Sequence, residues 1–175
     1  MSFLPHIFLR HKKQGAAELI NEILLSSKPD WGAYIDFLQD KEMQNGIDTL
    51  SDTEINVVSA YQFYVCINSS GLFSYFDLQT LWAQFGFQSM NAIGLPIYAN
   101  LIQTCLEQVN LSPNAKELEI AAHFTAAFHE DSDNLLDAFV PLEEVFYSGP
   151  SVENAVVSYI KLNAKKLSEQ FSTNG

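Results

Sequence analysis

Apolar residues recur along this chain at the i, i+3, i+4, i+7 spacing of amphipathic helices, and no segment alternates convincingly as a strand. The clearest helix follows Ser51-Asp52-Thr53-Glu54, a capping box in which the serine accepts a backbone N–H and the glutamate reaches back to another. The pattern therefore predicts an all-α fold, with helices over about 16–27, 29–38, 51–68, 78–85, 97–109, 112–128, 135–146 and 151–167.

The chain of 175 residues is long enough for one well-buried core and short for two domains. No repeat, low-complexity stretch or interdomain linker interrupts it. We therefore expect a single compact multi-helix domain over residues 1–175. Residues 1–15 are expected to form a terminal segment that docks on this domain through Phe3 and Phe8. Their apolar residues precede the basic ones, which is the reverse of the order in a secretory signal.

Two residues are expected to end or break a helix. Gly71 precedes an aromatic run from Leu72 to Phe76. Glycine adopts the left-handed backbone that ends many helices, and an apolar residue just beyond it closes the cap. We therefore predict a buried corner at Gly71, with a ligand site there as the less favoured alternative. Pro141 predicts a break inside 135–146, because proline lacks the backbone N–H that a helix needs.

The charge of the chain is strongly one-sided. Residues 42–160 contain one basic residue, Lys116, and fifteen carboxylates, whereas the whole chain has a net charge of −12. A field of one sign repels itself and destabilises the compact state, so its retention suggests a use. Binding to nucleic acid or to an anionic membrane needs basic patches, so neither is a leading function. Cation binding, solubility or a strongly basic partner would fit.

Catalytic and metal-binding motifs are missing from the sequence. There is no His-x-x-x-His or Cys-x-x-Cys pair, no phosphate-binding glycine loop with a lysine, and no Gly-x-Ser-x-Gly turn. We therefore expect no catalytic residue, no cofactor and no metal. Cys66 and Cys105 lie in apolar helical patterns and are expected to be buried free thiols, which fits a cytoplasmic protein. No apolar run approaches the length of a transmembrane helix.

The carboxylates offer a site of another kind. Asp133 and Asp137 stand on one helix face about 5–6 Å apart, a spacing comparable with that of phosphates along a DNA strand. Surface carboxylates at this spacing would imitate a phosphate row, although a merely solvated acidic face is the alternative. The candidate residues are Glu117, Glu119, Glu130, Asp131, Asp133, Asp137, Glu143 and Glu144. A secondary acidic group consists of Glu42, Asp48, Asp52 and Glu54.

Residues 52–109 add a family resemblance. The helix that opens at Asp52, its corner Ser69-Ser70-Gly71-Leu72 and the later step Ala92-Ile93-Gly94 resemble a helical domain family long catalogued as of unknown function. That family prefers Asn-Gly-Gly-Phe at the corner, where this chain departs from it. The size, helical pattern and acidity together look like the DNA-mimic protein of the family, which is a dimer. The resemblance implies that the chain occupies the DNA-binding surface of a helix-turn-helix transcription factor.

The sequence therefore favours a DNA mimic that binds a basic DNA-binding protein and relieves its repression. A homodimer is expected, because a dimeric helix-turn-helix protein reads two half-sites roughly 34 Å apart. The runner-up is an acidic adaptor or immunity-type protein that inhibits a basic enzyme or toxin. An enzyme with an unrecognised pocket is the third hypothesis.

Overall fold

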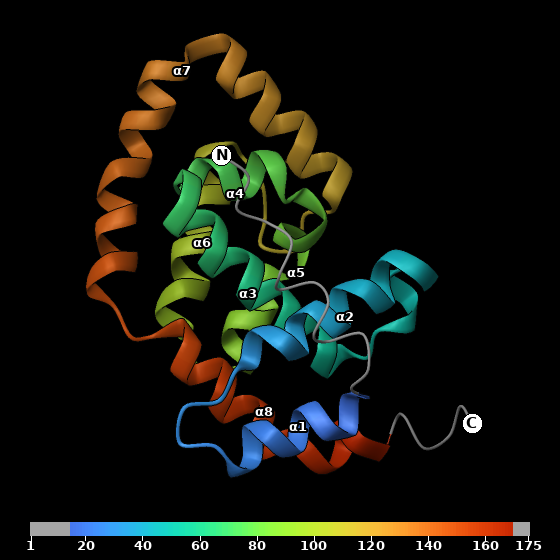
Figure 1. Cartoon of the computed structure of the whole chain (residues 1–175). Coiled ribbons are helices and arrows are strands. Elements are labelled where there is room, and N and C mark those ends of the chain that lie inside the picture. The colour runs from blue at the N-terminus through green and yellow to red at the C-terminus, as the bar shows by residue number, and fades with distance from the viewer. Residues whose placement is uncertain (1–14, 170–175) are drawn as a thin grey trace, which may run out of the picture. The chain divides into compact units, whose positions relative to one another are not determined.

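The computed structural model describes residues 15–169, and these residues form helices and no strands, which confirms the all-α prediction (Figure 1). The predicted docking of residues 1–15 falls, apart from Gly15, outside the described residues. The elements are α1 (Ala16–Leu25), α2 (Trp31–Asn45), the short 3₁₀ turn η1 (Ile47–Thr49), α3 (Asp52–Ser70), α4 (Leu72–Leu78), α5 (Thr80–Ala92), α6 (Pro96–Gln108), α7 (Glu117–Ser148) and α8 (Val152–Glu169).

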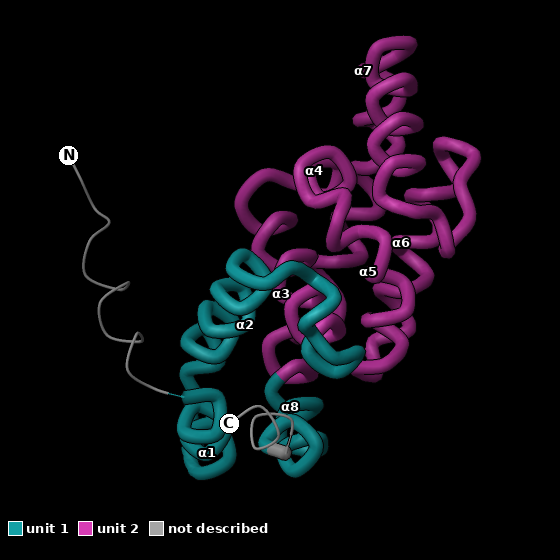
Figure 2. The backbone as a smooth tube through the Cα atoms, turned by 90° about the vertical axis from the view of Figure 1, so that its right-hand side faces the viewer, with its two compact units in different colours: residues 1–54, 157–175 teal, residues 55–156 magenta. Residues whose placement is uncertain are grey.

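The chain divides into two compact units (Figure 2). One consists of residues 1–54 and 157–175, and the other of residues 55–156. Helices α3 and α8 each begin in one unit and end in the other. The prediction of one domain over residues 1–175 stays a prediction.

The first unit is built around the apolar faces of α1 and α2. Leu19, Ile20 and Ile23 of α1 are buried, as are Tyr34 and Leu38 of α2. The spacing of these residues is that of a single helix face, which explains why the two helices bury one side each. From α8, Ile160 and Leu167 are also fully buried.

The capping box at the start of α3 is confirmed, and it is part of a buried ion pair. Glu54 Oε2 accepts the backbone N–H of Ser51 at 2.8 Å, and Ser51 Oγ accepts the N–H of Glu54 at 3.3 Å. Glu54 is 0% exposed, and Lys41 Nζ lies 2.9 Å from its Oε1. The carboxylate therefore has both a cation and hydrogen-bond donors, which a buried charge requires.

The second unit holds an aromatic core among α3, α4, α6 and α7. Phe63 of α3 contacts Tyr75, Tyr98 and Phe146, with ring centroids 5.2, 5.7 and 5.5 Å away. The hydroxyl of Tyr98 lies 2.6 Å from the carbonyl oxygen of Pro150, to which it donates. Large rings with satisfied polar ends bury much apolar area in fixed geometry, so this core holds α7 firmly.

Helix α7 differs from the prediction at both its start and its break. It begins at Glu117 and not at Ser112-Pro113, where the chain turns instead. Its break lies at Asp131, whose backbone has φ −157° and ψ 78°, and Pro141 lies inside continuous helix. Proline at that position removes only one hydrogen bond, to the carbonyl of Asp137, and both residues are exposed to water.

The corner at Gly71 is confirmed, but the aromatic run after it is itself a helix. Gly71 has φ +86°, and Leu72 just beyond it is fully buried. Residues 72–78 form α4, which turns Tyr75 and Phe76 into the core and packs against α7. The sequence pattern did not predict this helix, because its seven residues are too few for an apolar period to be recognised.

Candidate functional site

All eight carboxylates predicted to imitate phosphates lie on α7. The bend at Asp131 divides this helix into a first arm, residues 117–130, and a second arm, residues 132–148 (Figure 1). The first arm carries Glu117, Glu119 and Glu130, and the second carries Asp133, Asp137, Glu143 and Glu144. The acidic stretch of the sequence is therefore one structural element, bent once.

Asp131 causes the bend, because its side chain begins the second arm. Its Oδ1 accepts the backbone N–H of Asn134 at 3.3 Å, and its Oδ2 accepts from the Asn134 side-chain amide at 2.5 Å. An aspartate with extended backbone that accepts the N–H three residues on is an N-cap. Asp131 is exposed, but its carboxylate is already engaged within the helix.

Three carboxylates of the second arm form one outward stripe. Asp133, Asp137 and Glu144 are exposed, and steps of four and seven residues bring them to the same helix face. None of the three side-chain carboxylates makes a hydrogen bond or an ion pair with the described residues. The stripe runs over the eleven residue steps from Asp133 to Glu144, a rise of about 16 Å. These are the carboxylates of the second arm that remain available to a partner, and we call them the acidic stripe.

Glu143 and Glu119 have structural contacts instead. Glu143 is half-buried, and its Oε1 accepts the backbone N–H of Leu72 at 2.6 Å, which caps α4. Glu119 Oε2 accepts the N–H of Lys116 at 2.8 Å and so closes the start of α7. Both residues are therefore less available than Glu117 and Glu130, which have no such bond among the described residues.

Two phenylalanines of α4 hold the two arms of α7 together. Phe76 stacks on Phe124 of the first arm with centroids 4.7 Å apart, and it meets Phe139 of the second arm at 6.2 Å. Phe73 also contacts both of these rings, at 6.0 and 6.1 Å. Because Phe124 and Phe139 lie 6.1 Å from each other, the bend is filled by rings.

The secondary acidic group lies in the unit formed by residues 1–54 and 157–175, and Glu54 does not belong to an acidic surface there. Asp48 and Asp52 are exposed and Glu42 is half-exposed. Glu54 is fully buried and paired with Lys41, so the prediction that placed it in an acidic surface group is wrong. A capping glutamate next to a lysine only thirteen residues away was the sequence signal for this pairing.

Asp77 was missed by the sequence reasoning. It is exposed on α4, a helix that packs against α7, and it has no hydrogen bond or ion pair among the described residues. In the sequence it stands alone after the aromatic run, far from the other carboxylates. Only the packing of α4 on α7 makes it a neighbour of the acidic helix.

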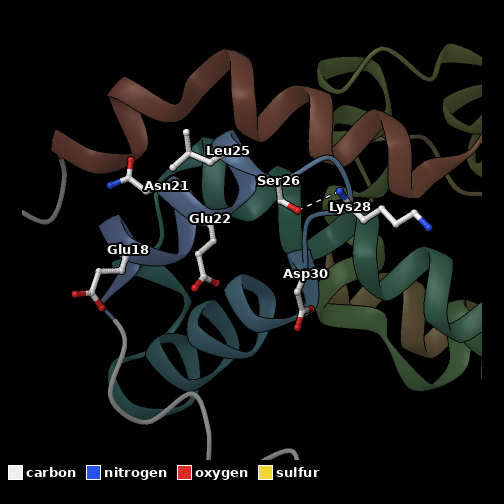
Figure 3. A pocket seen from close by; sticks show the side chains of 7 residues that line it. All are labelled: Glu18, Asn21, Glu22, Leu25, Ser26, Lys28 and Asp30. Atoms are coloured by element: carbon white, nitrogen blue, oxygen red, sulfur yellow. Dashed lines mark hydrogen bonds between the residues drawn. The ribbon is translucent and has the colours of Figure 1, made fainter.

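An open hollow of about 780 Å³ lies on α1 and the turn that follows it (Figure 3). It is lined by Glu18, Asn21, Glu22, Leu25, Ser26, Lys28 and Asp30. The side chain of Lys28 points away from the carboxylates in Figure 3, whereas its backbone N–H donates to Ser26 Oγ at 3.1 Å. The hollow is open and its lining carries charges of both signs. These lining residues do not include a nucleophile paired with a base, so they do not indicate a catalytic site.

The prediction that both cysteines are buried free thiols is confirmed. Cys66 and Cys105 are both buried and free, and burial raises the pKa of each above its ordinary value of 9.0. A thiol is reactive as its thiolate, so a raised pKa opposes nucleophilic chemistry. Within residues 15–169, no three His, Cys, Asp or Glu side chains come together as metal ligands would. None of the described helices is apolar over the length needed to cross a bilayer.

Comparison with known families agrees with the resemblance read from residues 52–109. The family model described as DMP19-like protein matches residues 48–163, more than half of the chain. The chain belongs to the DMP19-like family. This is a family of DNA-mimic proteins, as the resemblance implied, and the match extends over the whole of α7. No match was found among curated proteins or among solved structures.

Proposed function

We propose that this protein is a DNA mimic, whose α7 occupies the DNA-binding site of a basic helix-turn-helix transcription factor in the cytoplasm and relieves its repression. The observation that carries the proposal is the acidic stripe, an exposed row of carboxylates without partners among the described residues, in a member of the DMP19-like family. Arginines and lysines of the factor pair with the carboxylates as they would with phosphates, and counterions are released as they would be on DNA.

The charge density of α7 matches one DNA strand better than a duplex. Over the roughly 16 Å from Asp133 to Glu144, one strand carries about five phosphates and a duplex about ten. The second arm has four carboxylates in this interval, and Glu143 is turned towards α4. Such a row pairs with those basic residues of the factor that contact the phosphates of one DNA strand. Occupying these residues is enough to block binding to a half-site.

A homodimer would extend this contact to both halves of an operator. The second arm is about 25 Å long, and the half-sites of a helix-turn-helix dimer are about 34 Å apart. One copy of the arm therefore covers one half-site, and two copies related by symmetry would cover both. Light scattering that gives the monomer mass of 19.6 kDa across the micromolar range would contradict this part of the proposal.

The test begins with capture of partners from lysate on the immobilised full-length chain. A captured DNA-binding protein is then bound to its operator, and the chain is added in a mobility-shift titration. The proposal expects release of the operator at about stoichiometric amounts of the chain. An operator that stays bound at large excess would refute the proposal, and a captured nuclease or toxin would favour the inhibitor hypothesis.

Matched variants separate the acidic stripe from net charge. Asp133→Asn/Asp137→Asn/Glu144→Gln should lose affinity for the factor by orders of magnitude, while Asp133→Asn alone costs on the order of 1 kcal/mol, because exposed ion pairs are screened. The control is Glu18→Gln/Asp30→Asn/Glu107→Gln, which removes the same charge from exposed residues of α1, α6 and the turn before α2. Equal loss in both variants would mean that net charge, and not α7, drives binding.

A further inference from the structure

The second arm of α7 carries three large apolar side chains that are exposed to solvent. Leu136 is 40% exposed, Val140 is 56% exposed and Tyr147 is 60% exposed. Steps of four and seven residues place the three on one helix face, next to the buried face formed by Leu135, Phe139 and Phe146. We call Leu136, Val140 and Tyr147 the apolar seam.

One end of the apolar seam is fixed in place. The hydroxyl of Tyr147 donates to the carbonyl oxygen of Ile67 on α3 at 3.2 Å, and its ring meets Phe146 with centroids 5.3 Å apart. An exposed aromatic ring held at its polar end needs little further ordering when a partner packs on it.

The acidic stripe runs directly beside the apolar seam. Asp137 is three residues before Val140, and Glu144 is four residues after it, so both carboxylates lie within one turn of that side chain. Asp133 and Leu136 have the same relation. In heptad terms, Asp133, Val140 and Tyr147 occupy one core position, Leu136 and Glu143 the other, and Asp137 and Glu144 the flanking one. Three of these five core positions are apolar, so they offer a second helix a lengthwise line of apolar contact.

Charge decides what kind of helix fits. Between residues 117 and 160 there is no lysine or arginine, so the same arm of a second copy would set carboxylates against carboxylates. A helix with apolar side chains in line and basic residues along one edge would meet both rows at once. Recognition helices that read the major groove combine these features, since they contact thymine methyl groups between phosphates.

We propose that the second arm of α7 is a docking ridge for a basic amphipathic helix, which packs its apolar side chains on Leu136, Val140 and Tyr147 and pairs its basic residues with the acidic stripe. This inference rests on the proposed function, because it names the chemistry of the partner surface. Its consequence concerns salt. Apolar contact is not screened by ions, so the complex weakens less with added salt than the factor's complex with DNA does.

The experiment uses the full chain and synthetic peptides as probes. One peptide is helical, about as long as the arm, with leucines in line and arginines beside them. The second has the same composition in an order that spreads the leucines around the helix. Fluorescence anisotropy at several salt concentrations measures both affinities. We expect the ordered peptide to bind about tenfold tighter, the effect of burying a few apolar groups, with no loss of this ratio at high salt.

Four variants locate the contact. Leu136→Gln/Val140→Thr should bring the ratio between the two peptides close to one, with Val140→Thr alone as a milder change should the pair unfold. The matched control is Leu118→Gln, at an 81% exposed leucine on the first arm of the same helix, which should leave the ratio unchanged. The charge variant Asp133→Asn/Asp137→Asn/Glu144→Gln should have a lower affinity for both peptides, and the affinity for each should depend less on salt concentration. Circular dichroism checks the fold of each.

Several outcomes would overturn the inference. Equal affinity for both peptides means that binding depends on charge alone and not on apolar contact. An unchanged ratio in folded Leu136→Gln/Val140→Thr places the contact elsewhere. A fall in molar mass of that variant by light scattering shows that a second copy covers the seam. Each of these results leaves the proposed function standing if the operator is still released. An operator that is never released, with the peptide ratio as expected, refutes the proposed function alone.

Discussion

Glu143 Oε1 accepts the backbone N–H of Leu72 at 2.6 Å, across seventy-one residues of sequence. The bond satisfies a donor at the start of α4 and places a negative charge at the positive end of that helix. It also lies so close to Gly71 that a Cβ there would be 2.8 Å from the same oxygen. One carboxylate of the acidic helix thus depends on a glycine in another helix's cap.

Gly71→Ala should destabilise the protein by more than its backbone strain alone. Gly71 and Gly46 share φ +86°, but nothing lies within 4 Å of a Cβ at Gly46. Gly46→Ala therefore measures the strain of this backbone conformation, about 1–3 kcal/mol for a residue other than glycine, and Gly71→Ala adds the clash with Glu143. Urea unfolding gives both free energies.

A double variant separates the two effects at this corner. Glu143→Ala alone should cost about 1–3 kcal/mol, since the Leu72 N–H loses its acceptor. In the Glu143→Ala background, Gly71→Ala should cost no more than Gly46→Ala does. If the cost of Gly71→Ala is the same with and without Glu143, the close approach has no energetic weight.

Lys41→Met should be among the most damaging single changes in the first unit. It leaves the carboxylate of Glu54, which is 0% exposed, without its cation, and a broken buried pair costs about 3–5 kcal/mol. Adding Glu54→Gln should recover part of the loss, because the charge is then gone. Lys28→Met, at an exposed lysine, should change stability by less than about 0.5 kcal/mol. Thermal or urea unfolding of all three variants measures these changes in stability. Equal losses of stability in Lys41→Met and Lys28→Met would contradict the prediction.

Tyr34→Phe should stabilise the protein by about 1 kcal/mol, because the hydroxyl of Tyr34 is buried without a hydrogen-bond partner. Burial, and next the charge of Glu54, raise the pKa of Tyr34 above its ordinary value of 10.0. Because the pKa of Tyr34 is higher in the folded than in the unfolded state, its contribution to the free energy of unfolding is complete below pH 10. This contribution decreases as the pH rises beyond 10. The variant should therefore lose less stability than the parent between pH 9 and about 11.

The same substitution at Tyr98 serves as the control with opposite sign. Its hydroxyl lies 3.1 Å from the carbonyl oxygen of Phe146 and 2.6 Å from that of Pro150. Tyr98→Phe should therefore cost about 1–3 kcal/mol at neutral pH, because buried acceptors lose their donor. Urea midpoints at neutral and alkaline pH test both variants, and a destabilised Tyr34→Phe would show that its hydroxyl has a partner after all.

Neutralising the acidic stripe should leave the fold intact. Asp133 and Asp137 repel each other at i, i+4, so Asp133→Asn/Asp137→Asn/Glu144→Gln should be neutral or stabilising by a few tenths of a kcal/mol. Added salt screens this repulsion, so the parent should gain more stability from salt than the variant does. Urea unfolding at low and high salt measures the difference. A variant that unfolds in low salt would reveal contacts that these carboxylates make with the chain itself.

The helices and their buried faces could be predicted because apolar spacing and caps are local signals. Ser51 with Glu54, Gly71 and Ser151 each mark a helix end in the sequence, and each does so in the structure, where Ser151 Oγ accepts the N–H of Asn154 at 3.1 Å. The acidic residues were found as a stretch for the same reason. That they lie on one element was not predicted, because the apolar pattern gave two helices, 112–128 and 135–146, with Glu130, Asp131 and Asp133 between them.

The inner organisation of the site could not be predicted, since it depends on tertiary contacts. Aspartate and proline both disfavour a helix interior, but α7 bends only at Asp131, whose side chain caps the second arm, and stays helical at Pro141. The helix expected over 112–128 begins only at Glu117, and it buries Ile120 and Phe124, of which Phe124 stacks on Phe76 of α4. Glu143 differs from Glu144 only in facing α4.

The phenylalanines in the bend of α7 have a thermodynamic consequence for any partner. Acidic tails without fixed structure also attract basic proteins, but each loses conformational entropy when it is ordered on the partner. Here Phe73 and Phe76 of α4 contact Phe124 and Phe139 on the two arms, so the carboxylates are already spaced before the encounter. This ordering is completed during folding, so a partner that bound α7 would not have to supply the free energy of ordering it.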